Sequence, residues 1–220
     1  MKPIEIITGN TSYPAPYTHR VLIICEEKNI PYSLTMIDTE NKPAWFQTIA
    51  PLGLIPVLRM EEKIIFDSHA ICEYIDTLSK PAFLPEDVYL CAQHKSWMMF
   101  ADELAQEIAQ LVKQGNIINA DLKRLHFLFD IWNKKIQGDY FFGNQLSLVD
   151  IYLLSHVLWF DALEEEKVIP SIIQNYRSIK DWLNRMKLRS SVKKTMGDKY
   201  SQNFIALLKQ YHLIPKDTDN

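Results

Sequence analysis

The sequence predicts a chain of two parts, a small α/β unit followed by an all-helical unit. Strand and helix signals alternate over residues 1–78, in the order βαβ and then ββα. After Pro81 and Pro85, amphipathic helical patterns take over and continue to the end of the chain. We therefore expect one domain at 1–79, a linker at 80–88 and a second, helical domain at 89–220.

The first unit begins with a β-rich run at Ile4–Thr8. Pro16 suits the first turn of a helix, where its missing N–H costs nothing, and this helix is expected to end near Asn29. The remaining expected elements are a strand at Tyr32–Ile37, a short helix at Lys42–Ile49, a hairpin of Leu54–Arg59 and Lys63–Phe66, and an amphipathic helix at Ser68–Leu78.

The second unit reads as a series of helices with few breakers. Ser147 and Asp150 have the spacing of a capping box, which predicts a helix starting after Ser147. The other helices are expected at 90–113, 121–136, 176–187 and 201–211.

Composition limits the partners and the compartment that we expect. The 220 residues carry a net charge of −3, so the sequence predicts neither nucleic-acid nor membrane binding. No apolar run reaches the roughly 20 residues that a membrane span needs. The three cysteines are far apart and lack metal-ligand spacing. We expect no metal site, reduced thiols and a cytoplasmic location.

The segment around Ala15, Pro16, Tyr17 and Thr18 lies at the expected start of the first helix. A helix N-terminus presents free N–H groups and a partial positive charge, which suits a thiolate or a carboxylate. An ordinary helix start with proline at its first position would give the same pattern, so this segment alone is a weak signal.

Two further local features could bind a ligand. A cis Ile55–Pro56 bond would turn the backbone of Ile55 outward to pair with a peptide-like ligand, although an edge-strand proline fits the pattern equally well. Ser68 is expected as a helix N-cap. The same junction could hold a carboxylate while Asp67 pairs with an ammonium group, so a zwitterionic amino-acid end would suit it.

Together these features resemble the glutathione transferases, and specifically their omega class. The matching segments are 41–46, 51–58 and 67–76 in the first half, and 140–144 with 147–150 in the second. Residues 204–213 resemble the extra C-terminal helix of that class. The resemblance implies a thioredoxin-like first domain, a helical second domain and a homodimer.

The resemblance also implies which residues hold glutathione, the co-substrate, with no other cofactor. Asp67 and Ser68 should hold its γ-glutamyl end, Ile55, next to Pro56, should pair with the cysteinyl part, and Lys42 should approach the glycyl carboxylate. An apolar electrophile should occupy the cleft between the domains. Candidate residues for its lining are Met98, Phe100 and Trp159.

The departure from the family pattern is Ala15, which stands where omega proteins place the cysteine that forms a mixed disulfide with glutathione. Alanine cannot act as a nucleophile or a hydrogen-bond donor. Of the nearby hydroxyl side chains (Ser12, Tyr13, Tyr17 and Thr18), Tyr17 and Thr18 are the candidates for activating the thiol. Both could equally serve packing and capping.

The function expected from these observations is a glutathione transferase that conjugates apolar electrophiles in a detoxification role and is not a cysteine-dependent thioltransferase. A rival is a non-catalytic protein of the same fold that binds RNA polymerase, because residues 17–21 and 26–28 look similar to the stringent starvation protein A group. A member that only dimerises or carries ligands is a third possibility.

Overall fold

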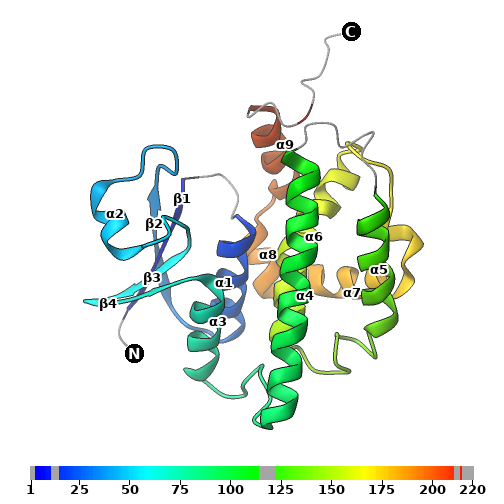
Figure 1. Cartoon of the computed structure of the whole chain (residues 1–220), viewed down its shortest axis with the longest axis horizontal. Helices are drawn as coiled ribbons and strands as arrows, with labels where there is room; N and C mark the ends of the chain where they lie inside the picture. The colour runs from blue at the N-terminus through cyan, green and yellow to red at the C-terminus, as the bar shows by residue number, and fades with distance from the viewer. Residues whose placement is uncertain (1–2, 11–14, 114–121, 211–213, 215–220) are drawn as a thin grey trace. The chain divides into compact units, whose positions relative to one another are not determined.

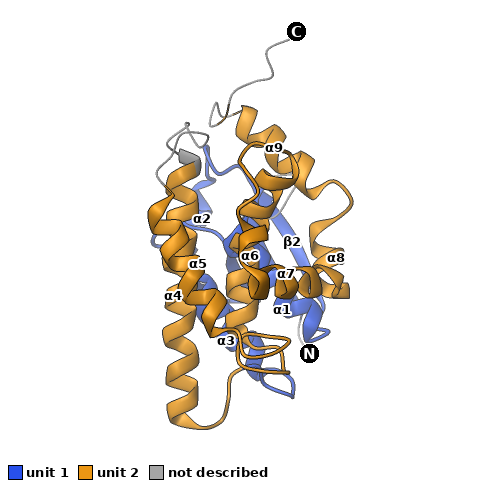
Figure 2. Cartoon of the chain, turned by 90° about the vertical axis from the view of Figure 1, so that its right-hand side faces the viewer, with its two compact units in different colours: residues 1–83 blue, residues 84–220 orange. Residues whose placement is uncertain are grey.

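The computed structural model describes residues 3–10, 15–113, 122–210 and 214. The chain divides into two compact units, residues 1–83 and 84–220, which Figure 2 colours separately. The division falls within the residues expected to form a linker.

Unit 1 contains a four-stranded mixed sheet in the order β2-β1-β3-β4. The strands are β1 (Ile4–Gly9), β2 (Tyr32–Ile37), β3 (Val57–Met60) and β4 (Lys63–Phe66). β1 pairs with β2 in parallel and with β3 antiparallel, and β3 pairs antiparallel with β4. This is the thioredoxin-like arrangement that the family resemblance implied.

Three helices cover the two faces of this sheet (Figure 1). Helices α1 (Pro16–Glu27) and α3 (Ser68–Thr77) pack together on one face, and the short helix α2 (Ala44–Ile49) lies on the other. Under α2, Phe46 and Ala50 contact Ile7, Ile37 and Val57 in a closed apolar core. The helices on the two faces hold the sheet in place and thereby position the loops at the ends of its strands.

The expected β3 began three residues too early. It starts at Val57 rather than Leu54, because Pro56 has no N–H to donate to a ladder and Gly53 adopts φ +63°. The Ile55–Pro56 peptide bond is cis, as considered from the sequence, and so is Lys80–Pro81.

Unit 2 is all-helical, as predicted. Its α-helices are α4 (Val88–Lys113), α5 (Lys123–Lys135), α6 (Leu148–Glu165), α7 (Arg177–Leu188), α8 (Ser190–Met196) and α9 (Tyr200–Gln210), with a short 3-10 helix at Ile173–Asn175. Helix α6 is central and packs against α4 and α9. The 3-10 helix and α8 were not predicted from the sequence.

Asp150 anchors the start of α6. Its carboxylate accepts hydrogen bonds from the Ser147 N–H (2.9 Å), the Phe141 N–H (2.8 Å) and the Trp182 indole N–H (2.8 Å). Burial raises the pKa of Asp150, and these bonds oppose that rise. The predicted capping box is therefore present and also ties α7 to the loop before α6.

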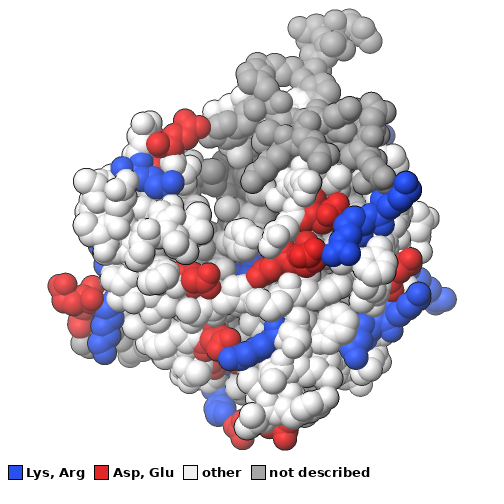
Figure 3. Space-filling view, viewed as in Figure 1, with Lys and Arg blue, Asp and Glu red and all other residues white. Residues whose placement is uncertain are grey.

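The charged side chains are mixed in sign, as the small net charge of −3 suggests. Acidic and basic side chains are interspersed on the face shown in Figure 3. Among the described helices, none combines the length and apolar character that a membrane span requires. Within the described residues, no cluster of His, Cys, Asp and Glu side chains could hold a metal ion.

Candidate functional site

The sheet of unit 1 brings the four predicted binding segments to one end of its strands. Gly9 at the end of β1 pairs with Ile37 at the end of β2, because these strands are parallel. β3 runs the other way, so its first residue, Val57, lies beside Ile7 and also beside Phe66 at the end of β4. The start of α1, the loop before α2, the Ile55–Pro56 turn and the start of α3 therefore converge.

Ala15 is the N-cap of α1, and Pro16 is its first helical residue, as predicted. No side chain caps this helix, and no acidic residue stands in its first turn. The positive end of the helix dipole is therefore not compensated by an acidic side chain of that turn.

Tyr17 and Thr18 point to different surroundings. Tyr17 is exposed by 40%, and the Arg20 guanidinium carbon lies 4.9 Å from the centre of its ring. Thr18 is fully buried, and its hydroxyl lies 2.8 Å from the hydroxyl of Thr8 on β1. The Thr18 hydroxyl therefore lies between α1 and the sheet, and its role in activating a thiol stays a prediction.

The other ionisable side chain at this helix start is uncharged at neutral pH. Burial lowers the pKa of His19 to about 3, so its imidazole is neutral at pH 7 and keeps one ring N–H. Arg20 is therefore the cation nearest to Tyr17 on this helix. The cysteine of α1, Cys25, is buried in the core, where burial raises its thiol pKa and suppresses the thiolate.

Asp67, not Ser68, is the N-cap of α3. The Asp67 carboxylate accepts hydrogen bonds from the backbone N–H groups of His69 (2.8 Å) and Ala70 (3.4 Å), and its φ is +76°. Ser68 is the first residue of the helix and is 5% exposed. The expected N-cap moves by one residue, because the Asp67 carboxylate reaches the orphan N–H groups that a serine hydroxyl would otherwise satisfy.

An open groove of about 580 Å³ runs along β4 and the first turns of α3. Asp67 and His69 contribute its polar wall, and Ile64, Phe66 and Ala70 contribute apolar surface. The exposed carboxylate of Asp67 can therefore meet a ligand while it caps α3.

The Ile55–Pro56 turn offers backbone groups to the same edge. Outside the helices and strands, none of the backbone hydrogen bonds between described residues uses the N–H or the carbonyl of Ile55. Its side chain lies close to β1, since a Cβ placed on Gly9 would come within 3.2 Å of the Ile55 Cδ1. The turn thus packs against the end of β1, and no backbone partner of Ile55 is found among the described residues.

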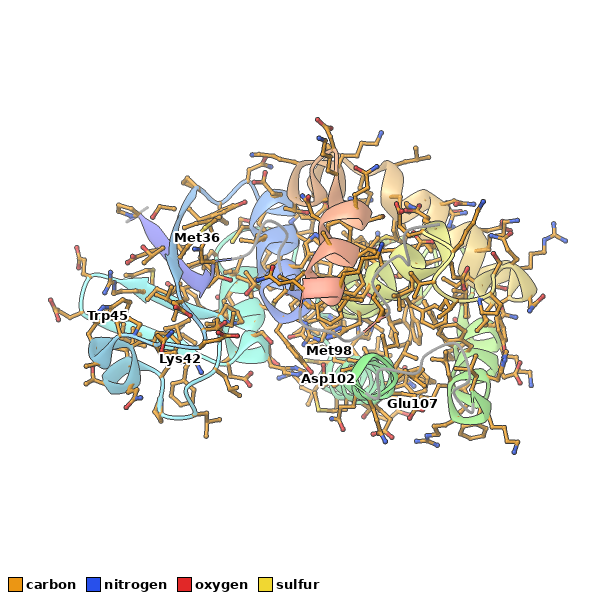
Figure 4. The ribbon with its side chains drawn as sticks, turned by 90° about the horizontal axis from the view of Figure 1, so that it is seen from above. Met36, Lys42, Trp45, Met98, Asp102 and Glu107 are labelled. Carbon is orange, nitrogen blue, oxygen red and sulfur yellow. The ribbon has the colours of Figure 1, made fainter. Side chains whose placement is uncertain are left out.

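Lys42 stands in the loop before α2, at the end of the sheet that β2 reaches. Figure 4 labels it together with Trp45 of α2. Lys42 is exposed, so its ammonium group is accessible to an anionic ligand.

The residues suggested for an electrophile pocket have varied surroundings within unit 2. Met98 is 1% exposed and belongs to the core. Phe100 is half-buried and packs against Trp97, and Trp159 stacks on Phe204 of α9 with ring centres 4.7 Å apart. Met98 is therefore packed within the chain, and the lining of an electrophile pocket stays a prediction.

Comparison with known proteins agrees with this geometry. Residues 15–78 match the family model for the N-terminal domain of glutathione S-transferases, and residues 101–189 match the model for the C-terminal domain. The chain belongs to the glutathione S-transferase family. Its two units correspond to the two domains of that family.

Several relatives of this chain are of the omega class. The chain is 28% identical to glutathione S-transferase omega-1 of Sus scrofa over 179 residues, which cover 78% of this chain and 72% of that protein. It is 26% identical to human omega-2 over 200 residues, covering 84% and 77%. A shorter match, 41% over 72 residues, links it to DHAR3 of Arabidopsis thaliana but spans only 28% of that protein.

Solved structures of the family share the fold. Omega 3C from Trametes versicolor superposes with a TM-score of 0.73 at 24% identity, covering 89% of this chain and 90% of that one. A rice transferase crystallised in complex with glutathione gives a TM-score of 0.80 at 20% identity, covering 96% and 98%.

Proposed function

We propose that this transferase binds glutathione at the edge of the sheet in unit 1 and conjugates it to an apolar electrophile. The observation that carries the proposal is the convergence of the start of α1, the Ile55–Pro56 turn and the Asp67–Ser68 helix start at one edge. The family membership and the glutathione-bound rice structure support it.

Of the residues proposed to contact glutathione, Asp67 and Lys42 are exposed, whereas Ser68 is 5% exposed. Asp67 would receive the ammonium group of the γ-glutamyl end, and the N-terminus of α3 at Ser68 would receive its carboxylate. The Ile55 backbone would pair with the cysteinyl amide, as a strand pairs with its neighbour. Lys42 would approach the glycyl carboxylate.

The free energy needed to ionise the glutathione thiol favours a hydrogen bond from Tyr17. An unperturbed thiol has a pKa of about 8.5, and lowering it by two units requires about 2.7 kcal/mol. A helix terminus contributes about 0.3–1 kcal/mol and seldom more than about 2. A hydrogen bond to a charged group adds about 1.5–3 kcal/mol. The helix alone falls short, so the phenol of Tyr17 would supply the missing bond.

Ala15 sets the type of chemistry. Disulfide exchange through this position would need a thiolate, which alanine lacks. The proposal is therefore conjugation and not thioltransfer, with the electrophile as the second substrate. A homodimer, a cytoplasmic location and a detoxification role belong to the same proposal.

Calorimetric titration with glutathione is the first test. We expect binding in the micromolar to low-millimolar range, at least tenfold weaker in Asp67→Ala. The matched control is Asp38→Ala, because Asp38 is also an exposed aspartate that caps backbone N–H groups at this end of the sheet. Absence of binding would reject the glutathione proposal and favour the rival, a protein partner such as RNA polymerase.

The role of Tyr17 is tested by the ionisation of bound glutathione, followed by the ultraviolet absorbance of the thiolate. Tyr17→Phe should raise the thiol pKa by about one to two units, the equivalent of one hydrogen bond to a charged group. Thr18→Val is the neighbouring control and should leave that pKa unchanged. An unchanged pKa in Tyr17→Phe would remove Tyr17 from the mechanism.

A further inference from the structure

Gly9 is the last residue of β1 and lies at the end of the strands where the proposed glutathione site is formed. It is buried and pairs with Ile37 on β2. It is not among the described glycines with positive φ, so its backbone conformation is open to any residue. The property of glycine that matters at this position is therefore the space that a side chain would otherwise fill.

Two methyl groups occupy the space beside Gly9. A Cβ at this position would come within 3.0 Å of the Thr39 Cγ2 and 3.2 Å of the Ile55 Cδ1. Carbon atoms that are not bonded to each other prefer a separation of about 3.5–4.0 Å. Alanine at position 9 would therefore press on two segments, the loop after β2 and the Ile55–Pro56 turn.

These two neighbours differ in how far they can yield. Thr39 is exposed, so it can move toward solvent. Ile55 is half-buried and packs against the closed apolar core under α2. A densely packed core has little room for a displaced methyl group. Pressure from position 9 would therefore move the turn, and with it the backbone of Ile55.

We propose that Gly9 is a positioning residue for the cysteinyl part of glutathione. Because Gly9 has no side chain, the Ile55 side chain can seat against the end of β1, and this seat sets the position of the Ile55 N–H and carbonyl. The inference rests on the proposed function, in which these backbone groups pair with the cysteinyl amide. Gly9 acts through Ile55 and is not a catalytic residue.

A methyl exchange between positions 9 and 55 tests this seat. Gly9→Ala adds one carbon, and Ile55→Val removes the Cδ1 carbon that the new Cβ would meet. All variants carry Thr39→Ser, which removes the Cγ2 contact and leaves Ile55 as the neighbour under test. Calorimetry measures the glutathione Kd of this parent, of both single variants and of the double variant.

Each single variant should bind glutathione more weakly than the parent. For Gly9→Ala the expected loss is about fivefold, the effect of losing one hydrogen bond between neutral groups. Ile55→Val should also lose affinity, because the seat is left partly empty. The double variant should return to within about twofold of the parent, because the exchanged carbons conserve the volume of the seat.

Gly9→Ala combined with Leu54→Val is the matched control. It removes one carbon from the neighbouring residue of the same turn, whose side chain is 66% exposed. This variant should bind glutathione as weakly as Gly9→Ala does. Restoration by Leu54→Val equal to that by Ile55→Val would overturn the seat.

Thermal unfolding checks that each variant is folded. If Gly9→Ala does not fold, the comparison of Ile55→Val with the double variant decides, because the double variant should bind glutathione more tightly. Unchanged affinity in folded Gly9→Ala, or equal affinities of Ile55→Val and the double variant, would overturn the role of Gly9. A wild-type chain that binds no glutathione would instead reject the proposed function, and this inference with it.

Discussion

Ala15 occupies the N-cap of α1 with φ −58° and ψ 146°, and its carbonyl accepts the His19 N–H at 2.7 Å. Ala15 thus has the backbone of a helix N-cap, and in the proposed function it takes the place of the omega-class cysteine. A cysteine at such a helix start has a lowered thiol pKa, because the helix dipole stabilises the thiolate.

Restoring a thiol at this position should change the reaction. We expect Ala15→Cys to reduce a glutathione mixed disulfide at a rate at least tenfold above the wild type, in an assay coupled to glutathione reductase. Ala44→Cys, which places a thiol at the first position of α2 after Pro43, is the control and should stay at the wild-type rate. If Ala15→Cys also stays there, the start of α1 does not face bound glutathione.

Tyr17 and Thr18 show that the sequence predicts the position of a helix start but not the direction of each side chain in it. Both carry hydroxyl groups at the predicted helix start, but successive helical residues point about 100° apart. One therefore faces solvent while the other hydrogen-bonds Thr8. The helix start could be predicted from Pro16, whereas the direction of each side chain depends on which face packs on the sheet.

Among the secondary-structure elements, those with clear end signals were predicted best. β2 was predicted at both ends, because Pro31 precedes it and its first and last residues, Tyr32 and Ile37, favour strands. α8 and the 3-10 helix were not, since seven and three residues span too few turns to show a periodicity. The N-cap of α3 was misplaced by one residue, because aspartate and serine are comparable N-caps in sequence.

Lys28 links three segments at the end of unit 1. Its ammonium group lies 2.8 Å from the Asp76 carboxylate and donates hydrogen bonds to the carbonyls of Asp76, Ser79 and Pro81. The same carboxylate accepts the Phe83 N–H at 2.8 Å. Both charged side chains are nearly inaccessible, at 3% and 4% exposure. The end of α1, the end of α3 and the exit segment are therefore held together by one buried ion pair.

Breaking this pair should destabilise unit 1 strongly. Lys28→Met leaves the Asp76 carboxylate buried without its cation, which costs about 3–5 kcal/mol of unfolding free energy. Chemical denaturation measures the loss. Lys28→Met combined with Asp76→Asn should lose less than the sum of the single variants, because no uncompensated charge remains.

The surface pair Arg177–Asp181 provides the control for that experiment. The two side chains are 3.7 Å apart and are 95% and 57% exposed. Arg177→Met should cost less than about 1 kcal/mol, as exposed pairs contribute little. A similarly small cost for Lys28→Met would mean that the exit segment is held by packing rather than by the ion pair.

At the scale of the whole molecule, the buried imidazole of His19 couples stability to pH. Burial lowers its pKa from 6.5 to about 3. Between those two pH values the unfolded chain binds a proton that the folded chain does not. Stability therefore falls as pH drops below 6.5, by about 1.4 kcal/mol per pH unit for one proton, and the loss is complete near pH 3.

Substitution of His19 separates its effect on the pH dependence of stability from the effect of the carboxylates. Glu5 has a pKa lowered chiefly by its hydrogen bond to Arg59, so its contribution is lost only as pH falls through the carboxylate range. Burial also lowers the pKa of His94, whose contribution is common to both proteins. Between pH 6.5 and pH 5 the wild type should therefore lose about 2 kcal/mol more unfolding free energy than His19→Gln, as measured by urea denaturation at each pH. Parallel losses in the two proteins would show that His19 becomes protonated while the chain is still folded.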